Sequence, residues 1–273
     1  MTAKNVAGEY DRRIRRAKHL VSVHPFAQEI LTFYVRVAEF QKGLYARALA
    51  NPHGDGKETS SLLTDAEIQG LLPRFKEFID LVVVHGPVTL AEFARQLAAA
   101  SPGSWSDALG SYWNAGGHEL RANAAFEQFL PRAFLQPFAE QLAGDVEGRQ
   151  IAGSPTLCPV CGARPLLGVL RPEGDGGKRF LMCSFCLREW EFRRIFCATC
   201  GEETENKLPV YVAEQFPQMR VEGCETCKFY LRTIDMTKDG NAVPLVDDLA
   251  AIPLSLWAEE HGLSRAQPNL LGT

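Results

Sequence analysis

The residues of this sequence with the clearest capacity for chemistry are its eight cysteines. All of them lie between Cys158 and Cys227, and each belongs to a Cys-x-x-Cys pair. A tight turn across such a pair presents two sulfurs to one metal ion at a distance of about 2.3 Å. Because a tetrahedral site takes four ligands, the four pairs predict two metal sites.

The pairs repeat in type and in spacing. They read CPVCG, CSFC, CATCG and CETC, with 21 residues between the first two pairs and 23 between the last two. We interpret this pattern as a tandem duplication of one metal-ribbon unit. An interleaved arrangement, in which the second and third pairs share an ion across ten residues, is the alternative. The predicted ligands are Cys158, Cys161, Cys183 and Cys186 for site 1, and Cys197, Cys200, Cys224 and Cys227 for site 2.

The metal in these sites follows only in part from the ligands. No histidine lies between residues 158 and 227, so both sites are predicted to be all-thiolate. Four tetrahedral sulfurs suit zinc or a single iron, and the C-x2-C-x2-C-x3-C-P run of cluster ferredoxins is absent. Four thiolates leave about −2 around a divalent ion and about −1 around a ferric ion. Metal binding therefore takes the chain below its formal charge of −4.

The metals are predicted to hold the fold rather than to catalyse. A ribbon of about 40 residues buries too little apolar surface to be stable alone. A catalytic ion needs an open coordination position, which four thiolates close. The sequence also lacks the P-loop, G-x-G-x-x-G, G-x-S-x-G and H-E-x-x-H motifs. We expect a protein that is not an enzyme, with a redox or metal-sensing role as the alternative.

The cysteines also indicate a compartment. The double arginines Arg12-Arg13 and Arg15-Arg16 are not followed by the apolar segment of an export signal, and no run approaches 18 apolar residues. We therefore expect a cytoplasmic chain without membrane insertion, whose thiols stay reduced and serve as metal ligands. The composition, 46% hydrophobic and 23% charged, is that of a globular protein.

The elements that must position the cysteines differ between the two halves. Before residue 150, apolar side chains recur at helical spacing, as in the stripe Phe26, Ile30, Phe33, Val37, Phe40 and Leu44. Thr64 or Asp65 can cap the next helix, and Pro131 and Pro137 are expected to divide the last one. The expected helices cover residues 26–49, 65–85, 89–97, 105–113 and a segment entered at Pro131.

The second half predicts short strands. LLGVL and KRFLMC flank the turn sequence RPEGDGG, and LPVYVAEQF and QMRVEGC flank Pro217, so each unit contains a hairpin. REWEFRRIF and KFYLRTIDM follow as third strands, and a helix is expected over 246–262. The fold class is α+β: an N-terminal all-α domain, two tandem ribbons of rubredoxin or zinc-ribbon type, and a C-terminal helix. The predicted boundaries are 1–150, 151–195, 196–240 and 241–273.

Nucleic acid, the usual partner of zinc ribbons, is the alternative partner. Its best patch is Arg188, Arg193 and Arg194, interleaved with Trp190 and Phe192. The same residues fit an exposed strand face. The acidic total argues against nucleic acid as the partner.

The whole pattern resembles the FdhE family of formate dehydrogenase accessory proteins. The resemblance rests on the order and spacing of the four cysteine pairs together. It extends to the HPF segment at His24, the stretch RFLMCSFCLREWEFRR, KFYLRTIDM, VDDLA at Val246 and the closing NLLG.

The resemblance implies a cytoplasmic, non-catalytic maturation factor. Its partner would be the catalytic subunit of a respiratory molybdenum formate dehydrogenase before twin-arginine export. It also implies rubredoxin-like iron on the eight cysteines. Rubredoxin knuckles end in glycine, whereas Leu187 and Lys228 follow the second pair of each unit here, so zinc stays open. The sequence leaves the oligomeric state open, a homodimer included.

Overall fold

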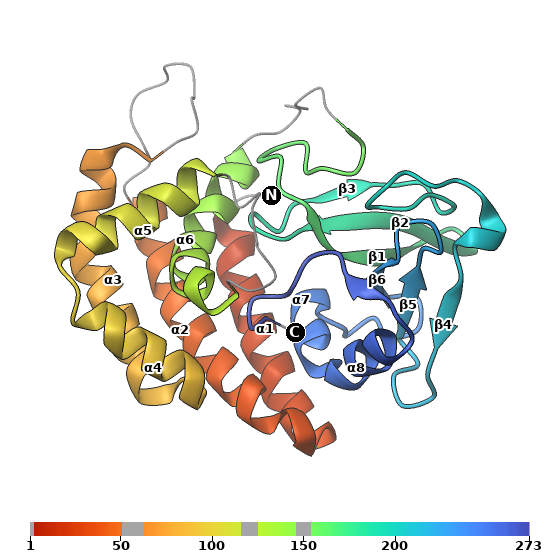
Figure 1. The fold of residues 1–273 in the computed structure, drawn as a ribbon, viewed down its shortest axis with the longest axis horizontal. Helices are drawn as coiled ribbons and strands as arrows, with labels where there is room; N and C mark the ends of the chain where they lie inside the picture. Colours follow the sequence, from red (N-terminus) through yellow and green to blue (C-terminus); the bar gives the residue numbers. More distant parts are fainter. Residues whose placement is uncertain (1–2, 51–62, 116–124, 146–153, 273) are drawn as a thin grey trace.

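The computed structural model describes residues 3–50, 63–115, 125–145 and 154–272. Helices gather on one side of the molecule and strands on the other, with the last two helices beside the sheet (Figure 1). No helix within these ranges combines the length and the apolar character needed to cross a membrane. The helices of the first part are α1 (Ala3–Val23), α2 (Gln28–Ala50), α3 (Asp65–His85), α4 (Val88–Ala98), α5 (Pro102–Asn114) and α6 (Ala125–Asp145).

Most of the apolar spacing predicts burial correctly. Thr64 caps α3 by accepting the amide of Glu67, which in turn accepts the Thr64 amide. The α2 stripe faces the core except at Phe26, whose side chain is 56% exposed. Pro25 opens a 3₁₀ turn, Pro25–Ala27, so the α-helix begins only at Gln28 and Phe26 lies outside it.

Helix α1 was not among the predicted elements. Its buried residues Tyr10, Ile14, Ala17 and Leu20 have spacings of 4, 3 and 3, a helical pattern. Four arginines and Lys18 lie between these residues, so the segment looks polar by composition. Arg13 is also buried, at 8% exposed, so the buried face of α1 includes a charged residue beside its apolar stripe.

The prediction that proline divides the last helix of the first half is wrong. Pro131 and Pro137 both lie inside the continuous helix α6. Proline at 137 removes the amide that would bond to the carbonyl of Ala133. The Gln41 side chain on α2 donates to that carbonyl instead, at 2.7 Å, so a neighbouring helix satisfies the freed group.

The strands of the two predicted ribbons form one sheet. Its order is β3-β2-β1-β6-β5-β4, and β7 also pairs with β6. Each ribbon supplies a hairpin and a third strand, as expected, although the third strand of the first ribbon is only three residues long. The strands are β1 (Pro165–Glu173), β2 (Gly176–Cys183), β3 (Glu189–Glu191), β4 (Val210–Val212), β5 (Met219–Gly223), β6 (Phe229–Asp235) and β7 (Ser264–Arg265).

The two ribbons join where β1 pairs with β6 in parallel. Gly168, Val169 and Leu170 lie opposite Thr233, Ile234 and Asp235. A Cβ atom on Gly168 would lie 2.3 Å from the Thr233 hydroxyl oxygen. Any other residue at this position would have to displace the Thr233 side chain, so glycine fits best here.

The single C-terminal helix expected over 246–262 is two helices, α7 (Pro244–Ala250) and α8 (Ile252–Glu260). The chain bends at Ala251, whose φ of −92° and ψ of 33° are not helical. Pro253 lies two residues later, where its ring fits the first turn of a new helix. Because of the bend, Leu249 is buried while Leu256 is 56% exposed, so the predicted common face does not exist.

Buried ion pairs fasten the helices to the rest of the chain. Arg16 on α1 makes a two-pronged contact with Asp247 on α7, at 2.5 and 3.0 Å. Asp248 is fully buried between Arg232 and Arg265. Burial alone would raise the pKa of the Asp248 carboxyl, but the two guanidinium groups lower it below its ordinary value. The α+β architecture is thus confirmed, with one core shared by helices and sheet.

Replacing Gly168 tests the junction between the ribbons. Gly168→Ala should lower the free energy of unfolding by about 1–3 kcal/mol, because the added methyl group overlaps Thr233. Urea unfolding of the metal-loaded protein measures the change. Gly176→Ala is the control, since its nearest neighbour lies 4.0 Å away. Adding Thr233→Ala to Gly168→Ala should recover part of the loss; an unchanged midpoint for Gly168→Ala alone would contradict the account.

Candidate metal centres

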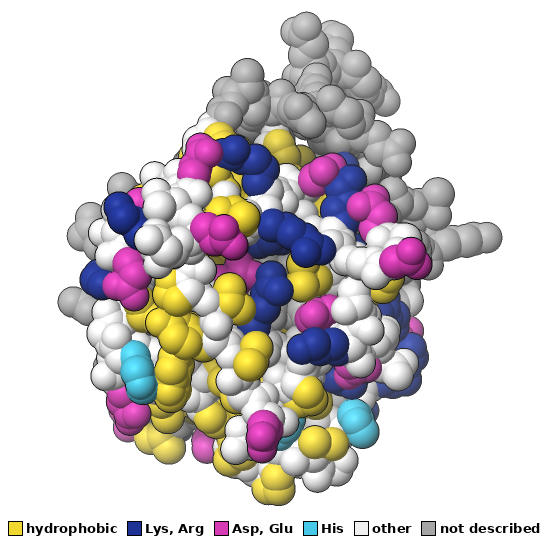
Figure 2. Space-filling view, turned by 90° about the vertical axis from the view of Figure 1, so that its right-hand side faces the viewer, with side chains coloured by type: hydrophobic (Ala, Val, Ile, Leu, Met, Phe, Trp, Pro, Cys, Tyr) yellow, Lys and Arg dark blue, Asp and Glu magenta, His cyan; other side chains and the backbone are white. Residues whose placement is uncertain are grey.

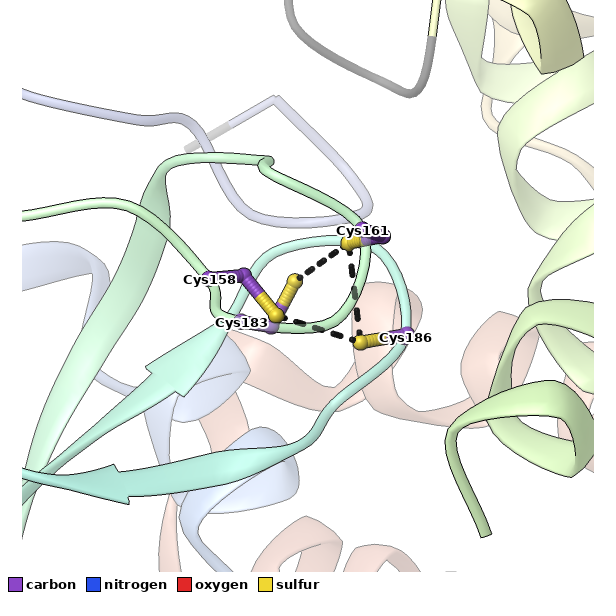
Figure 3. A group of neighbouring side chains, drawn as sticks. All are labelled: Cys158, Cys161, Cys183 and Cys186. Atoms are coloured by element: carbon purple, nitrogen blue, oxygen red, sulfur yellow. Dashed lines mark hydrogen bonds between the residues drawn. The ribbon is translucent and has the colours of Figure 1, made fainter. Parts of the chain in front are cut away.

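The eight cysteines form two clusters of four sulfurs. One contains Cys158, Cys161, Cys183 and Cys186, and the other Cys197, Cys200, Cys224 and Cys227. The grouping follows sequence order, so the interleaved alternative is not the arrangement found. Figure 3 shows the four side chains of site 1 converging from two loops at the end of the first ribbon.

The sulfur separations fit a tetrahedral metal ion. Neighbouring sulfurs lie 3.4–3.6 Å apart in site 1. They lie 3.7–3.8 Å apart in site 2. Ligands about 2.3 Å from a central ion have tetrahedral edges of about 3.8 Å, whereas a disulfide brings its sulfurs to about 2.05 Å. The donor type and the spacing therefore suit one four-thiolate ion per cluster.

The turns that present the sulfurs end alike in all four pairs, and three of them direct an amide at a sulfur. The amides of Val160, Phe185 and Thr199 point at the first sulfur of their pair, at 3.4–3.5 Å. Such amides stabilise the negative charge of a thiolate. The residue after the second cysteine is left-handed each time: φ is 74° at Gly162, 55° at Leu187, 80° at Gly201 and 61° at Lys228.

Leu187 and Lys228 hold a conformation that glycine adopts freely. An L-residue there costs about 1–2 kcal/mol. In the same turn, the amide of Lys228 donates to the Cys224 carbonyl at 2.8 Å, just as the Gly162 amide donates to that of Cys158 at 2.9 Å. The ligation turn thus keeps its backbone shape whether or not it ends in glycine.

The four thiols of site 1 lie close together, and the pKa values of Cys158, Cys183 and Cys186 shift in different directions. Hydrogen bonds from the other three cysteines lower the pKa of the Cys158 thiol. Burial raises the pKa of Cys183, and hydrogen bonds to Cys158 and Cys161 raise that of Cys186. A metal ion that binds all four as thiolates must therefore displace protons, so its affinity falls as the pH falls.

Site 1 is anchored in the helical part through the tip of its second knuckle. Phe185, between Cys183 and Cys186, is 3% exposed. Its ring makes edge contacts with Tyr112 and Trp113 of α5, at centroid distances of 5.3 and 5.7 Å. Such contacts between aromatic rings are each worth about 0.5–1.5 kcal/mol beyond the burial of area. The cysteines on either side of Phe185 therefore fix how α5 meets the ribbon.

Arg132 of α6 bonds to the same knuckle. Its guanidinium donates to the Ser184 carbonyl at 3.1 Å and to the Asn269 carbonyl at 2.9 Å. The side chain is buried, and burial lowers its pKa. Cys183 acts in the opposite direction by charge, so a thiolate cluster beside Arg132 offsets part of the cost of burying this cation. One arginine thus joins α6, the knuckle and the C-terminal segment.

Site 2 is more exposed than site 1. Cys200 is exposed, and the knuckle residue Ala198 packs in a small separate cluster with Leu181, Phe192 and Leu231. Three cysteines of site 1 belong instead to the main core. The two units share ligand type and backbone turn, but only site 1 is built into the contact between helices and sheet.

The predicted basic patch is engaged within the chain. Arg188 donates to the Ala143 carbonyl, Arg193 pairs with Glu203, and Arg194 bonds to the Gly177 carbonyl. Trp190 donates its ring N–H to the Pro155 carbonyl, and Phe192 is buried. Each of these side chains thus has a partner within the chain, and Arg193 and Arg194 are exposed.

Histidine contributes to neither cluster in the part of the chain that is described. His24 packs against Phe216, and His261 stacks on Trp257. His53 and His118 lie outside the described residues. The metal clusters found within the described ranges consist of cysteine alone.

Comparison with known proteins places this arrangement in a family. The profile of the FdhE central domain matches residues 157–194, and that of the FdhE C-terminal domain matches residues 195–271. A protein named "Protein FdhE homolog" from Shewanella oneidensis is 30% identical over 277 residues, which cover 96% of this chain and 88% of the relative. The chain belongs to the FdhE family. A second FdhE homolog, from Aquifex aeolicus, is 26% identical over 97% of this chain and 95% of its own length.

The FdhE likeness extends to the fold. The crystal structure of the FdhE protein from Pseudomonas aeruginosa superposes with a TM-score of 0.67 at 26% sequence identity. The match covers 97% of this chain and 96% of that one. The helices, the joined ribbons and the C-terminal helices therefore belong to a fold that this FdhE protein shares.

Two contacts that hold site 1 in this FdhE chain could not be predicted from the sequence. Phe185 occupies a variable position of its Cys-x-x-Cys pair, and nothing in the spacing shows that its ring enters the helical part. Arg132 follows Pro131 in a segment that looks like the start of a helix. Its only sequence signal is a cation in an otherwise apolar run.

Substitution of one cysteine in each site should have unequal effects. Cys200→Ser and Cys183→Ser should each lower the metal content from about two ions per chain to about one. Cys183→Ser should also make α5 and α6 sensitive to limited proteolysis, because Phe185 and Ser184 lose their fixed positions. Elemental analysis and proteolysis under matched conditions measure both effects. Equal protease sensitivity of the two variants would contradict the assignment of site 1 to the contact between helices and sheet.

Glycine substitutions test the left-handed turns. Lys228→Gly should raise the free energy of unfolding of the metal-loaded protein by about 1 kcal/mol, and Gly201→Ala should lower it by about the same amount. Gly240→Ala serves as the control because nothing lies within 4 Å of its Cβ position. Denaturant midpoints compare the three variants, and a stabilising Gly201→Ala would show that the turns are not strained.

Proposed function

We propose that this chain is a non-catalytic accessory factor for a respiratory molybdenum formate dehydrogenase. In this proposal it binds the catalytic subunit in the cytoplasm before export. Membership of the FdhE family carries the proposal, together with the accessory role that the resemblance to that family implies. Site 1 supports the proposal because its cysteines lie where the helical part meets the sheet. A metal ion there would make rigid the surface that these two parts form together.

The geometry of the clusters supports a role in binding rather than in catalysis. Four sulfurs at tetrahedral spacing complete the coordination of one ion and leave no position for a substrate. Bound there, the ion would supply rigid cross-links between loops. The chain's own residues do the rest: Phe185 locates α5, and Arg132 locates α6 and the C-terminal segment.

The resemblance favours rubredoxin-like iron in both sites, and zinc fits the same donors. The left-handed backbone at Leu187 and Lys228 supports rubredoxin-type turns despite the missing glycines. Elemental analysis and a visible spectrum of protein purified without oxygen separate the two metals, because ferric thiolate absorbs visible light and zinc does not. Two irons per chain with visible bands are expected; two zincs and no colour would assign both sites to zinc.

A pull-down tests the partner. The metal-loaded chain should retain the formate dehydrogenase catalytic subunit, and Cys183→Ser should retain less than about a tenth as much, because the surface loses its support at site 1. Gly240→Ala is the control, because nothing lies within 4 Å of its Cβ position and it belongs to neither metal site. The proposal fails if the chain retains no subunit and instead binds RNA or DNA with a steep salt dependence, as a zinc-ribbon nucleic-acid protein would.

A further inference from the structure

Strand β4 leaves one edge of the sheet open. It is the last strand in the sheet order, and among the described residues no strand pairs with its outer side. The Gly223 amide bonds to the Pro209 carbonyl, and antiparallel pairs alternate, so Tyr211 exchanges hydrogen bonds with β5. The backbone N–H and C=O groups of Val210 and Val212 therefore point away from β5.

The side chains at this edge are apolar and exposed. Val210 is 53% and Val212 72% exposed. Tyr211 points to the other face, where its ring lies 4.7 Å from that of Trp257 on α8 and holds the strand in place. Figure 2 views the molecule from the side of β4 and shows hydrophobic side chains gathered in a band on this face.

The first unit shows which kind of strand can pair with the edge that corresponds to β4. Glu222 of β5 and Leu181 of β2 each precede the first cysteine of their knuckle by two residues. Glu222 pairs with Val210, and Leu181 pairs with Gly168. The residues of β4, 210–212, are therefore the counterparts of residues 168–170 of β1. Those β1 residues are the ones that pair with β6, in parallel.

The repeat also predicts a size restriction. Gly168 makes room for Thr233 of β6, but its counterpart in β4 is Val210. A strand that pairs with β4 in the same register therefore needs a small side chain, such as glycine, alanine or serine, where β6 carries threonine. This restriction distinguishes the β4 edge from a general apolar surface.

The charges around the edge favour a basic occupant. Residues 201–228 contain six acidic and three basic side chains, and four thiolates around a divalent ion in site 2 add about −2. Glu205 precedes β4 in the chain and Glu214 follows it, both exposed and without an ion-pair partner among the described residues. Cationic side chains at the ends of an added strand would pair with these carboxylates.

We propose that the outer edge of β4 binds an extended segment of the partner polypeptide as an added, parallel strand. The segment has a small residue opposite Val210, apolar neighbours and lysine or arginine at its ends. Main-chain hydrogen bonds supply affinity, and the restrictions on side chains supply selectivity. This inference rests on the proposed function, because the segment belongs to the formate dehydrogenase catalytic subunit.

A second copy of the chain is the competing occupant. Strand β3 is the counterpart of β6 and lies at the opposite end of the sheet. Pairing of β3 from one copy with β4 of the next would repeat the internal junction head to tail. Such contacts do not close and would generate chains of increasing length, which sedimentation detects.

The test compares two valine-to-proline variants of the metal-loaded full chain. Val212→Pro removes an outward N–H and blocks strand addition. Val88→Pro is the matched control, since Val88 is 73% exposed and occupies the first position of α4, where proline fits. The probes are the intact catalytic subunit and ten-residue peptides that tile its sequence. Metal content and circular dichroism establish that both variants fold.

We expect Val212→Pro to weaken binding of the subunit and of the best basic peptide at least about tenfold, and Val88→Pro to leave it unchanged. The amides of Val210 and Val212 should become protected from hydrogen exchange in the complex. Equal binding by Val212→Pro overturns the edge site while the proposed function stands. Loss of self-association in Val212→Pro assigns the edge to a second copy, and no binding of the subunit by the unaltered chain refutes both proposals.

Discussion

The structure depends on the closure of site 1 around four sulfurs. This closure fixes a loop whose tip, Phe185, lies against two aromatic rings of α5, while Arg132 of α6 bonds to the same loop. Four metal–thiolate bonds would cross-link the two loops of the site, and such binding contributes directly to the free energy of folding. The contact between the helical part and the sheet therefore rests on the same loop that would hold the ion, in addition to the buried ion pairs of α1 and α7.

The two similar units have different surroundings in the fold. In the first unit, the second knuckle packs against the helices and the edge of β1 pairs with β6. Both surfaces are therefore covered within the chain. The second unit has the more exposed cysteine cluster and leaves the edge of β4 open. The same local geometry thus stabilises the fold in one copy and, in our proposal, receives a partner in the other.

The sequence predicted the parts of the fold that depend on local spacing. Cysteine pairs, turn residues and helical stripes identified both clusters, both hairpins and most of α2 to α5. The rest depends on contacts far apart in the chain. Helix α6 continues through Pro137 because Gln41 satisfies a carbonyl, and the ribbons join because Gly168 admits Thr233. Neither contact leaves a periodic signal. The bend at Ala251 had a signal in Pro253, which the apolar spacing of the tail outweighed.

The coupling between site 1 and the helical part can be measured by a double-mutant cycle. Phe185→Ala should lower the free energy of unfolding of the metal-loaded protein by about 3–5 kcal/mol. In a Cys183→Ser background, where the loop is no longer held, the same substitution should cost less than about 1 kcal/mol. Costs that add, with Phe185→Ala equally destabilising in both backgrounds, would show that the metal site and the contact with the helices are independent.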